Sequence, residues 1–236
     1  MNGNASSLKG NVCNYYRWNL DVFSIEKGKK ILELGCGPGL NFNAIMAYSP
    51  TLYVATDYSQ VYLDEISKLF QGRQNCKTCY LDLMKKNYSE ILQENYFDYL
   101  LCFDVLEHLE DDELALKNIN QLMKQNHSRF LLIKVPALPG IYGQNDAAIG
   151  HYRRYTIPSL KSVLSRSLFQ VHSIRYQNIV GVIPWYVIGT VLKRKLAVSN
   201  GEGKIFERLV PFLQWIEGII PPPLGLSICC ICTPSK

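Results

Sequence analysis

Residues 30–39 read KILELGCGPG, and this stretch decides the fold of the chain of 236 residues. A strand-like apolar run over 30–34 leads directly into three closely spaced glycines, and a helical pattern follows to about Tyr48. Glycines at such a turn allow positive φ and a close approach of backbone to a bound molecule. A dinucleotide-binding G-x-G-x-x-G loop would have its third glycine where this chain has Leu40. The spacing therefore disfavours a pyrophosphate-binding loop.

Strand-like and helix-like segments alternate from Lys29 onward, which is typical of a sheet with helices on both faces. In the helix predicted over 111–124, the periodicity directs Leu114, Ile119, Leu122 and Met123 toward the core. A glycine- and proline-rich loop of about fifteen residues follows Pro136, and loops of this length usually have a function. Two apolar helical segments are predicted before Pro221. The other predicted strands are 51–56, 76–81, 96–103, 129–135, 169–176 and 224–232, and the other predicted helices are 58–70 and 157–166.

Composition and charge limit the class of protein. With 47% hydrophobic and 19% charged residues, the chain suits one α/β domain over residues 1–236. The net charge of +5 is dispersed, which disfavours nucleic acid as a partner.

Two further features bear on location and assembly. The first twenty residues lack the apolar core of a signal peptide, and the apolar run over 179–192 contains Pro184 and is too short to cross a bilayer, so we expect a cytoplasmic protein without a transmembrane segment. Residues 179–195 join apolar side chains to Lys193-Arg194-Lys195. Peripheral membrane contact, a core helix and a dimer interface all remain open for this segment. The protein is expected to be a monomer or a homodimer.

The eight cysteines do not indicate a disulfide framework, since the chain is neither small nor marked for secretion. Cys76 and Cys79 form a lone C-x-x-C without a second pair at ligand spacing. The sequence therefore predicts no metal site.

Acidic residues follow the second and third predicted strands. Asp57 lies 57 − 39 = 18 residues beyond the last glycine of the loop, and its carboxylate could accept hydrogen bonds from both hydroxyls of a ribose. Asp82 could meet an adenine amine in the same way. Open α/β sheets bind ligands at this edge. Helix capping is the alternative role for each acid.

These motifs resemble those of class I S-adenosylmethionine-dependent methyltransferases. Residues 33–39 (ELGCGPG) resemble the first motif, Asp57 the ribose-binding acid of the second, and 103–109 (FDVLEHL) the fourth, in the form of the ubiquinone-biosynthesis-like branch. The resemblance runs from Tyr15 to Val135. It implies a Rossmann-like seven-stranded sheet of order 3-2-1-4-5-7-6 with strand 7 antiparallel, and S-adenosylmethionine as cofactor. The cofactor-binding residues it implies are Tyr16, Glu33, Gly35, Cys36, Gly37, Gly39, Asp57, Tyr58, Asp82, Leu83, Phe103 and Asp104.

A second resemblance covers residues 134–156. Its centre, GHYRRY at 150–155, is similar to an element of uncharacterised bacterial methyltransferases, in which a pattern like PPLGLS at 222–227 also occurs. This resemblance names no substrate.

Methyl transfer from a sulfonium is an in-line displacement, so the protein must align the acceptor and remove its proton where it has one. The candidate catalytic residues are His108, His151 and Tyr152. Arg153 and Arg154 could clamp a carboxylate or phosphate of the acceptor. Tyr142 and Tyr155 complete the predicted acceptor side. The domain is thus expected to consist of a helical cap over 1–28, a cofactor-binding half over 29–135, and an acceptor side over 136–236 with its loop, helices and last strands.

Each of these roles has a structural alternative. His108 could brace the helix that follows it, the two arginines could form surface ion pairs, and Tyr15 or Tyr16 could pack on the sheet rather than reach the methionine carboxylate. The predicted function is the transfer of a methyl group to an oxygen or nitrogen atom of a small-molecule acceptor, with a carbon atom also possible. A non-catalytic S-adenosylmethionine-binding module and an NAD-dependent oxidoreductase remain alternatives.

Overall fold

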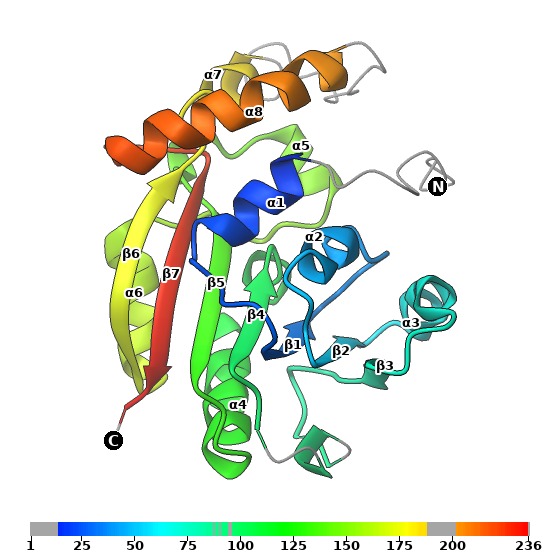
Figure 1. Ribbon diagram of the computed structural model, residues 1–236. Helices are drawn as coiled ribbons and strands as arrows, with labels where there is room; N and C mark the ends of the chain where they lie inside the picture. The colour runs from blue at the N-terminus through cyan, green and yellow to red at the C-terminus, as the bar shows by residue number, and fades with distance from the viewer. Residues whose placement is uncertain (1–13, 87, 90, 94–95, 188–201, 236) are drawn as a thin grey trace.

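The computed structural model describes residues 14–86, 88–89, 91–93, 96–187 and 202–235. Its strands form one sheet in the order β3-β2-β1-β4-β5-β7-β6 (Figure 1). The first five strands pair in parallel, and β7 runs antiparallel to both β5 and β6. The predicted strand order and direction are confirmed. The strands are β1 (Lys30–Leu34), β2 (Leu52–Asp57), β3 (Cys76–Tyr80), β4 (Tyr99–Phe103), β5 (Phe130–Pro136), β6 (Phe169–Gln177) and β7 (Ser227–Pro234).

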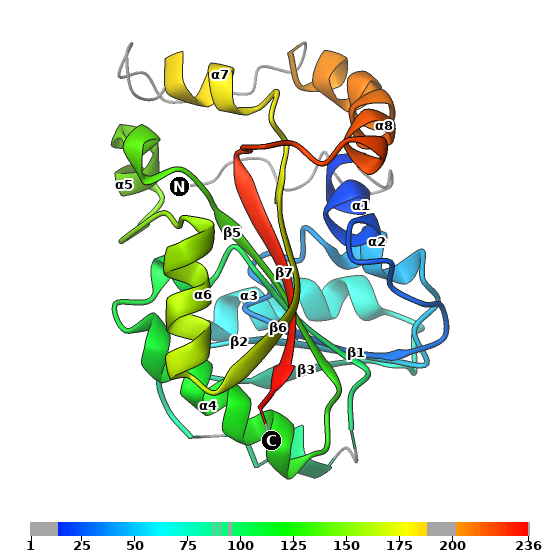
Figure 2. The same cartoon turned by 90° about the vertical axis from the view of Figure 1, so that its left-hand side faces the viewer.

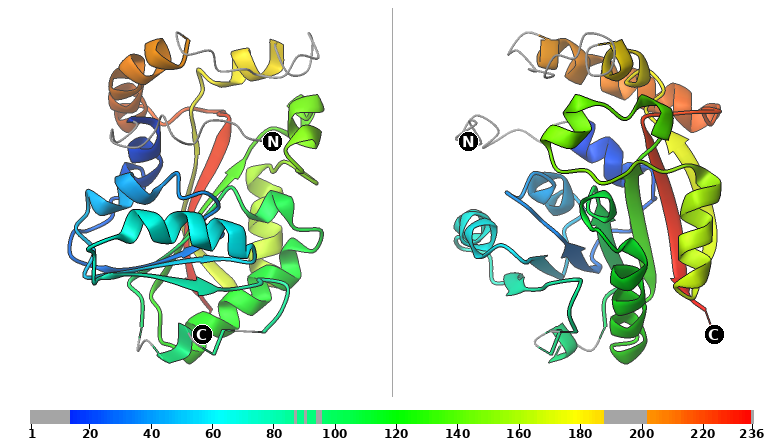
Figure 3. Two further views of the ribbon diagram at one scale, coloured as in Figure 1. Left: turned by 90° about the vertical axis from the view of Figure 1, so that its right-hand side faces the viewer. Right: turned by 180° about the vertical axis from the view of Figure 1, so that it is seen from behind.

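Helices cover both faces of the sheet (Figures 2 and 3). One face carries α1 (Asn14–Asp21), α2 (Phe42–Met46) and α3 (Gln60–Ser67), and the other carries α4 (Asp112–Gln125) and α6 (Ile157–Arg166). The helix α8 (Glu202–Ile219) lies beside α1, and the Gln214 amide donates a hydrogen bond of 2.9 Å to Asp21 of α1. No helix among the described residues is both long and apolar enough to span a bilayer.

Alternation along the strands produces one core on each face. In β4, Leu100 and Cys102 pack with α4 and α6, whereas Leu101 and Phe103 pack with α1 to α3. This follows from the period of two in a strand, and a parallel sheet buries both sets. The same alternation directs two charged side chains, Glu33 of β1 and Lys134 of β5, to the α1–α3 face.

The structure corrects one predicted core residue and some boundaries. Leu114 is 38% exposed, because the buried stripe of α4 consists of residues spaced by three and four positions and Leu114 lies beside it in the first turn. The strand β4 starts at Tyr99 rather than at Tyr96, which is exposed under the Lys30 ammonium. The buried stripe comprises Ala115, Leu116, Ile119, Leu122 and Met123.

The segment after β5 is not the continuous loop that the sequence predicts. It contains a 3₁₀ turn, η5 (Pro139–Ile141), and a short helix, α5 (Gln144–Ala148). The predicted last strand starts three residues later, at Ser227. Of the two apolar helical segments, α7 (Val182–Pro184) is short, and residues 188–195 of the segment considered for membrane contact lie outside the described residues.

Candidate active site

The glycine loop after β1 lies where the parallel strands end together. Leu34, the last residue of β1, pairs with Thr56 of β2 on one side and with Cys102 of β4 on the other. Gly35, Gly37 and Gly39 have φ of 69°, 50° and 82°, a region that L side chains rarely adopt.

The three glycines of this loop serve two purposes. A Cβ on Gly35 would lie 2.7 Å from Val105, and one on Gly39 would lie 2.9 Å from Ile66 of α3. These two glycines therefore permit close packing. Nothing lies within 4 Å of the corresponding position on Gly37. Gly37 is thus the glycine that borders open space.

Asp57 at the end of β2 contacts this loop directly. Its Oδ2 accepts a 2.9 Å hydrogen bond from the Gly37 amide, and its Oδ1 accepts one of 2.9 Å from the Ser59 amide. Ser59 precedes α3, so Asp57 does not cap that helix. Each carboxylate oxygen has a further lone pair. The glycine loop and the acid form one site, as a ribose-binding role requires.

Other predicted cofactor residues surround this contact. Tyr58 is 70% exposed beside Asp57, and Asp57 pairs with Tyr80 at the end of β3. Asp82, which follows β3, accepts a hydrogen bond from the Met84 amide and pairs with Lys85. Leu83 is buried behind it in the α4–α6 core. Open space at Gly37, the Asp57 carboxylate and the exposed Tyr58 ring together fit an adenosine-bearing cofactor.

Three predicted cofactor residues place their side chains in the protein interior. Glu33 is 1% exposed and accepts hydrogen bonds from the Tyr53 hydroxyl and the Asn41 amide. Burial raises the pKa of Glu33 to about 7, against the lowering effect of these two bonds. The Cys36 side chain is buried, and the Phe103 ring stacks on Phe23. The backbone of these residues remains for a ligand, and their predicted cofactor-binding role stays a prediction.

The Asp104 carboxylate forms an ion pair that the sequence analysis missed. Its oxygens lie 2.6 Å and 2.8 Å from the Lys134 ammonium, and the Lys134 side chain is 3% exposed. Burial lowers the pKa of Lys134, but the charges of Asp104 and Tyr15 outweigh it and the net pKa is raised. The Tyr15 ring lies 5.8 Å from this ammonium. A lysine within the apolar run FLLIKVP of β5 was the signal available in the sequence.

Tyr16 packs against the core between the sheet and α1 to α3. Its neighbour Tyr15 meets it edge to face at 5.7 Å. Packing, the alternative to a cofactor contact, thus accounts for at least part of the role of Tyr16.

The segment 150–155 folds back onto residues 106–112. The Tyr152 amide donates a 2.7 Å hydrogen bond to the Glu107 carbonyl, and His108 Nδ1 lies 3.3 Å from the Gly150 carbonyl oxygen. The His108 and His151 rings meet edge to face with centroids 4.7 Å apart. The structure therefore brings together the two candidate catalytic histidines.

Two buried carboxylates complete this cluster, and neither was predicted to act. Asp146 Oδ1 lies 2.9 Å from His151 Nδ1, and Glu107 Oε1 lies 3.7 Å from His151 Nε2. Burial, with the charge of Asp104, raises the pKa of Glu107 well above its usual range. Burial, with the neighbouring His151, lowers the pKa of His108. Glu107 stood inside the quoted motif, and only its neighbours drew attention.

Comparison with known proteins bears on this geometry. Residues 32–128 match the methyltransferase domain family. The ubiquinone biosynthesis O-methyltransferase of Coxiella burnetii is 27% identical over 108 residues, which are 44% of this chain and 43% of that protein. The matched residues include the glycine loop, Asp57 and β4. The chain spans less than half the length of the curated relatives that it matches.

Solved structures share the fold of this chain. The TehB-like S-adenosylmethionine-dependent methyltransferase from Corynebacterium glutamicum has a TM-score of 0.55 at 16% identity, over 98% of this chain and 93% of that one. The [4+2]-cyclase SpnF has a TM-score of 0.59 at 14% identity, over 94% of this chain and 82% of that one. At such identities the likeness concerns the fold alone.

Arg153 and Arg154 hold the segment 150–155 in place, which differs from the predicted acceptor clamp. Arg154 Nε lies 2.7 Å from Asp146, its Nη1 donates to the Ala137 carbonyl, and its side chain is 1% exposed. Arg153 bonds to the Glu110 carbonyl and pairs with Asp112 at 3.0 Å. The reason is local: residues 150–155 pack on residues 106–112, where Arg153 finds its partners, whereas Arg154 is held by Asp146 of α5 and by the Ala137 carbonyl that follows β5.

The predicted tyrosines of the acceptor side divide into two groups. The Tyr155 hydroxyl donates to Asp112 and its ring is 3% exposed, so it belongs to the interior. Tyr142 and Tyr152 are 39% and 58% exposed, and the Tyr142 hydroxyl donates to the His151 carbonyl. Tyr142 and Tyr152 keep an exposed face beside the histidines.

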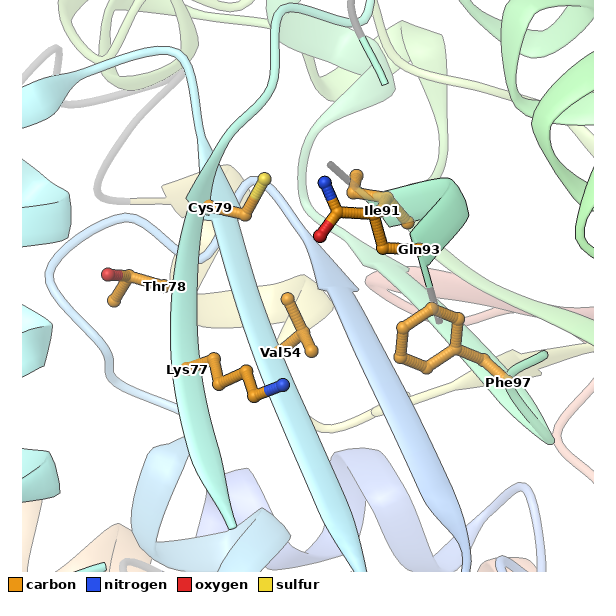
Figure 4. A pocket seen from close by; sticks show the side chains of 7 residues that line it. All are labelled: Val54, Lys77, Thr78, Cys79, Ile91, Gln93 and Phe97. Atoms are coloured by element: carbon orange, nitrogen blue, oxygen red, sulfur yellow. The ribbon is translucent and has the colours of Figure 1, made fainter. Parts of the chain in front are cut away.

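A separate cavity of about 360 Å³ opens beside β2, β3 and the 3₁₀ turn η3 (Ile91–Gln93). None of its lining residues belongs to the glycine loop or the histidine cluster. Cys79 lines it, whereas Cys76 packs with the opposite core, so the C-x-x-C pair points to two faces of the sheet. No disulfide joins the seven cysteines that the structure describes. Figure 4 shows the lining residues Val54, Lys77, Thr78, Cys79, Ile91, Gln93 and Phe97.

Proposed function

We propose that this chain transfers the methyl group of S-adenosylmethionine to a small-molecule acceptor. The observation that carries the proposal is the hydrogen bond between the Gly37 amide and the Asp57 carboxylate, at a point where Gly37 borders open space. This arrangement supplies acceptors for the ribose hydroxyls and room for backbone contact with the cofactor. The family match over 32–128 supports it.

The acceptor side is proposed to lie at the histidine cluster, within residues 136–236 and the adjoining end of β4. His108, Tyr142 and Tyr152 are exposed there, and His151 lies against His108. An imidazole can accept the proton of a hydroxyl or amine during transfer. Relatives named as ubiquinone biosynthesis O-methyltransferases support a small-molecule acceptor that is methylated on oxygen.

The rival functions keep the fold and change the chemistry. SpnF, a [4+2]-cyclase of the same fold, shows that a chain with this architecture can have another named activity. An S-adenosylmethionine-binding module without transfer would bind the cofactor and leave every acceptor unmodified. An NAD-dependent oxidoreductase would be stabilised thermally by NAD.

The test combines cofactor titration with a transfer assay. Purified full chain is titrated calorimetrically with S-adenosylmethionine and its demethylated product, and labelled methyl donor is then supplied with pooled small metabolites. Asp57→Asn should weaken cofactor binding about 10- to 100-fold, because it removes charge-assisted hydrogen bonds of about 1.5–3 kcal/mol. Asp64→Asn, on exposed α3, is the matched control and should leave binding unchanged. No binding by the unaltered chain would refute the proposal, and binding without any labelled product would favour the non-catalytic module.

A further inference from the structure

Glu107, His108 and His151 place one possible ligand atom each within 4.8 Å of one another. The first two side chains come from the 3₁₀ turn η4 (Leu106–His108), and the third comes from the segment after α5. Docking of that segment onto Glu107, through the Tyr152 amide, holds the three together.

The Glu107 carboxylate has no hydrogen-bond partner among the described residues. Glu107 is fully buried, and neither of its side-chain oxygens receives a hydrogen bond. His151 Nε2 lies 3.7 Å from Glu107 Oε1, which is too far for a hydrogen bond. Buried carboxylates are normally paired or bound to metal, because removal from water is costly otherwise. A buried carboxylate without a hydrogen-bond partner, close to two imidazoles, is an arrangement that a bound cation would stabilise.

The histidines are oriented as metal-binding histidines usually are. Asp146, whose side chain is also fully buried, accepts from His151 Nδ1 and leaves the lone pair of Nε2 toward Glu107. The Gly150 carbonyl oxygen can likewise accept a hydrogen bond from His108 Nδ1, which leaves Nε2 of His108 free to bind a metal ion. Carboxylate or carbonyl groups behind ligand histidines fix the tautomer and the ring orientation.

We propose that Glu107, His108 and His151 bind a divalent transition-metal ion. Two imidazoles with one carboxylate suit Zn²⁺, Fe²⁺ or Co²⁺, whereas Mg²⁺ and Ca²⁺ prefer oxygen ligands throughout. Bonds of about 2.0–2.2 Å place tetrahedral ligands about 3.3 Å apart, so the exposed His108 side chain closes by about 1.5 Å on binding. The sequence prediction of no metal rested on the lack of a second cysteine pair or a His-x₃-His at ligand spacing, and such spacing does not reveal three residues that meet only through folding.

The role of the ion rests on the proposed function. Three protein ligands leave coordination positions open, and an acceptor can fill them with oxygen lone pairs. The geometry favours acceptors with two adjacent oxygen donors, such as vicinal hydroxyls or a hydroxyl beside a carbonyl. A histidine nitrogen that binds the ion no longer serves as a base. The ion would instead lower the pKa of a bound hydroxyl, so that the hydroxyl proton is lost to solvent water before methyl transfer.

Metal binding is tested on the metal-stripped full chain without cofactor. Titration with Co²⁺ is followed by visible absorption, and the melting temperature is measured with and without Zn²⁺. The unaltered chain should bind one equivalent, with a spectrum that lacks thiolate charge transfer. Glu107→Gln and His151→Ala should weaken binding at least about tenfold, and Asp146→Asn by about 10- to 100-fold. His172→Ala, which removes an exposed histidine of β6, is the control and should bind as the unaltered chain does.

The variants also separate binding from folding. Glu107→Gln keeps the shape of the side chain and removes a buried charge, so its metal-free melting temperature should equal or exceed that of the unaltered chain. Only its response to Zn²⁺ should be lost. Absence of Co²⁺ binding at millimolar concentration, or equal affinity in Glu107→Gln, would overturn the metal site. Titration of the same samples with S-adenosylmethionine reports separately on the proposed function, because Gly37 and Asp57 are not part of the metal cluster.

Discussion

The substitution Gly35→Ala tests the packing of the cofactor loop. Its new methyl group would lie 2.7 Å from Val105 Cγ2, and Gly35 has a φ of 69°. The left-handed conformation costs about 1–2 kcal/mol for a residue with a Cβ. The overlap with Val105 adds about 1–3 kcal/mol, as for other overpacked sites. The free energy of unfolding should therefore fall by about 2–5 kcal/mol.

Gly28 offers a matched control for this substitution. Its φ of 72° is nearly the same, but nothing lies within 4 Å of a Cβ placed there. Gly28→Ala should therefore cost only the backbone contribution of about 1–2 kcal/mol. Gly28 precedes β1 and does not belong to the cofactor loop, so S-adenosylmethionine binding should be kept in this variant and weakened in Gly35→Ala.

Urea unfolding, followed by tryptophan fluorescence, measures the two costs on the same scale. Trp18 is buried beside the sheet and should report on the loss of tertiary structure. If the two variants unfolded with free energies within about 0.5 kcal/mol of each other, the contact with Val105 would contribute nothing and the reasoning would be refuted.

Three further predictions concern buried charges. Asp104→Ala leaves the 3% exposed Lys134 side chain without its partner and should lower the free energy of unfolding by about 3–5 kcal/mol. Lys134→Met leaves a half-exposed Asp104 that water can solvate, so it should lower that free energy clearly less; equal losses in urea unfolding would contradict this prediction. Because the folded-state pKa of Glu33 is raised to about 7, the contribution of Glu33 to stability is present below its ordinary pKa and is lost as the pH rises through about 7. From about pH 5 to about pH 8 the unaltered chain should therefore lose about 3 kcal/mol of unfolding free energy that Glu33→Gln keeps. Parallel pH profiles of the two proteins would contradict this prediction. Arg154→Ala should lower the free energy of unfolding by about 3–5 kcal/mol, because Asp146 is then buried without the guanidinium group. Arg153→Ala should lower it by at most about 1 kcal/mol, because the Arg153 side chain is 30% exposed. An unchanged melting temperature together with a raised acceptor KM in Arg154→Ala would support the acceptor clamp instead.

Local sequence signals were sufficient where the chain contacts itself over short distances. The boundaries of β1 and α6 were predicted as observed, since an apolar run ending at glycine and a Thr-Ile-Pro start define them. The partner acid Asp57 was also identified, because the carboxyl ends of neighbouring parallel strands must meet at one edge. The strand order itself came from the resemblance of motifs and not from periodicity.

The histidine cluster could not be predicted in this way. His108 and His151 were each chosen from a motif, but nothing in the spacing of 103–109 and 150–155 placed the two stretches in contact. Glu107 was overlooked because a glutamate after a strand is usually solvated, and its burial depends on the segment that folds over it. The arginines were assigned to a ligand for the same reason, since their partners Asp146 and Asp112 come from other elements.

By itself, the sequence determined the sheet edge, the glycine loop and the acid that faces it, because these follow from the period of strands and from the few residues that tolerate positive φ. Only the tertiary structure decided which charged groups pair with one another and which remain exposed. Burial and long-range contacts set that outcome. The segment that packs over Glu107 brings a carboxylate and two imidazoles together, and hydrogen bonds of Arg153 and Arg154 hold this segment in place.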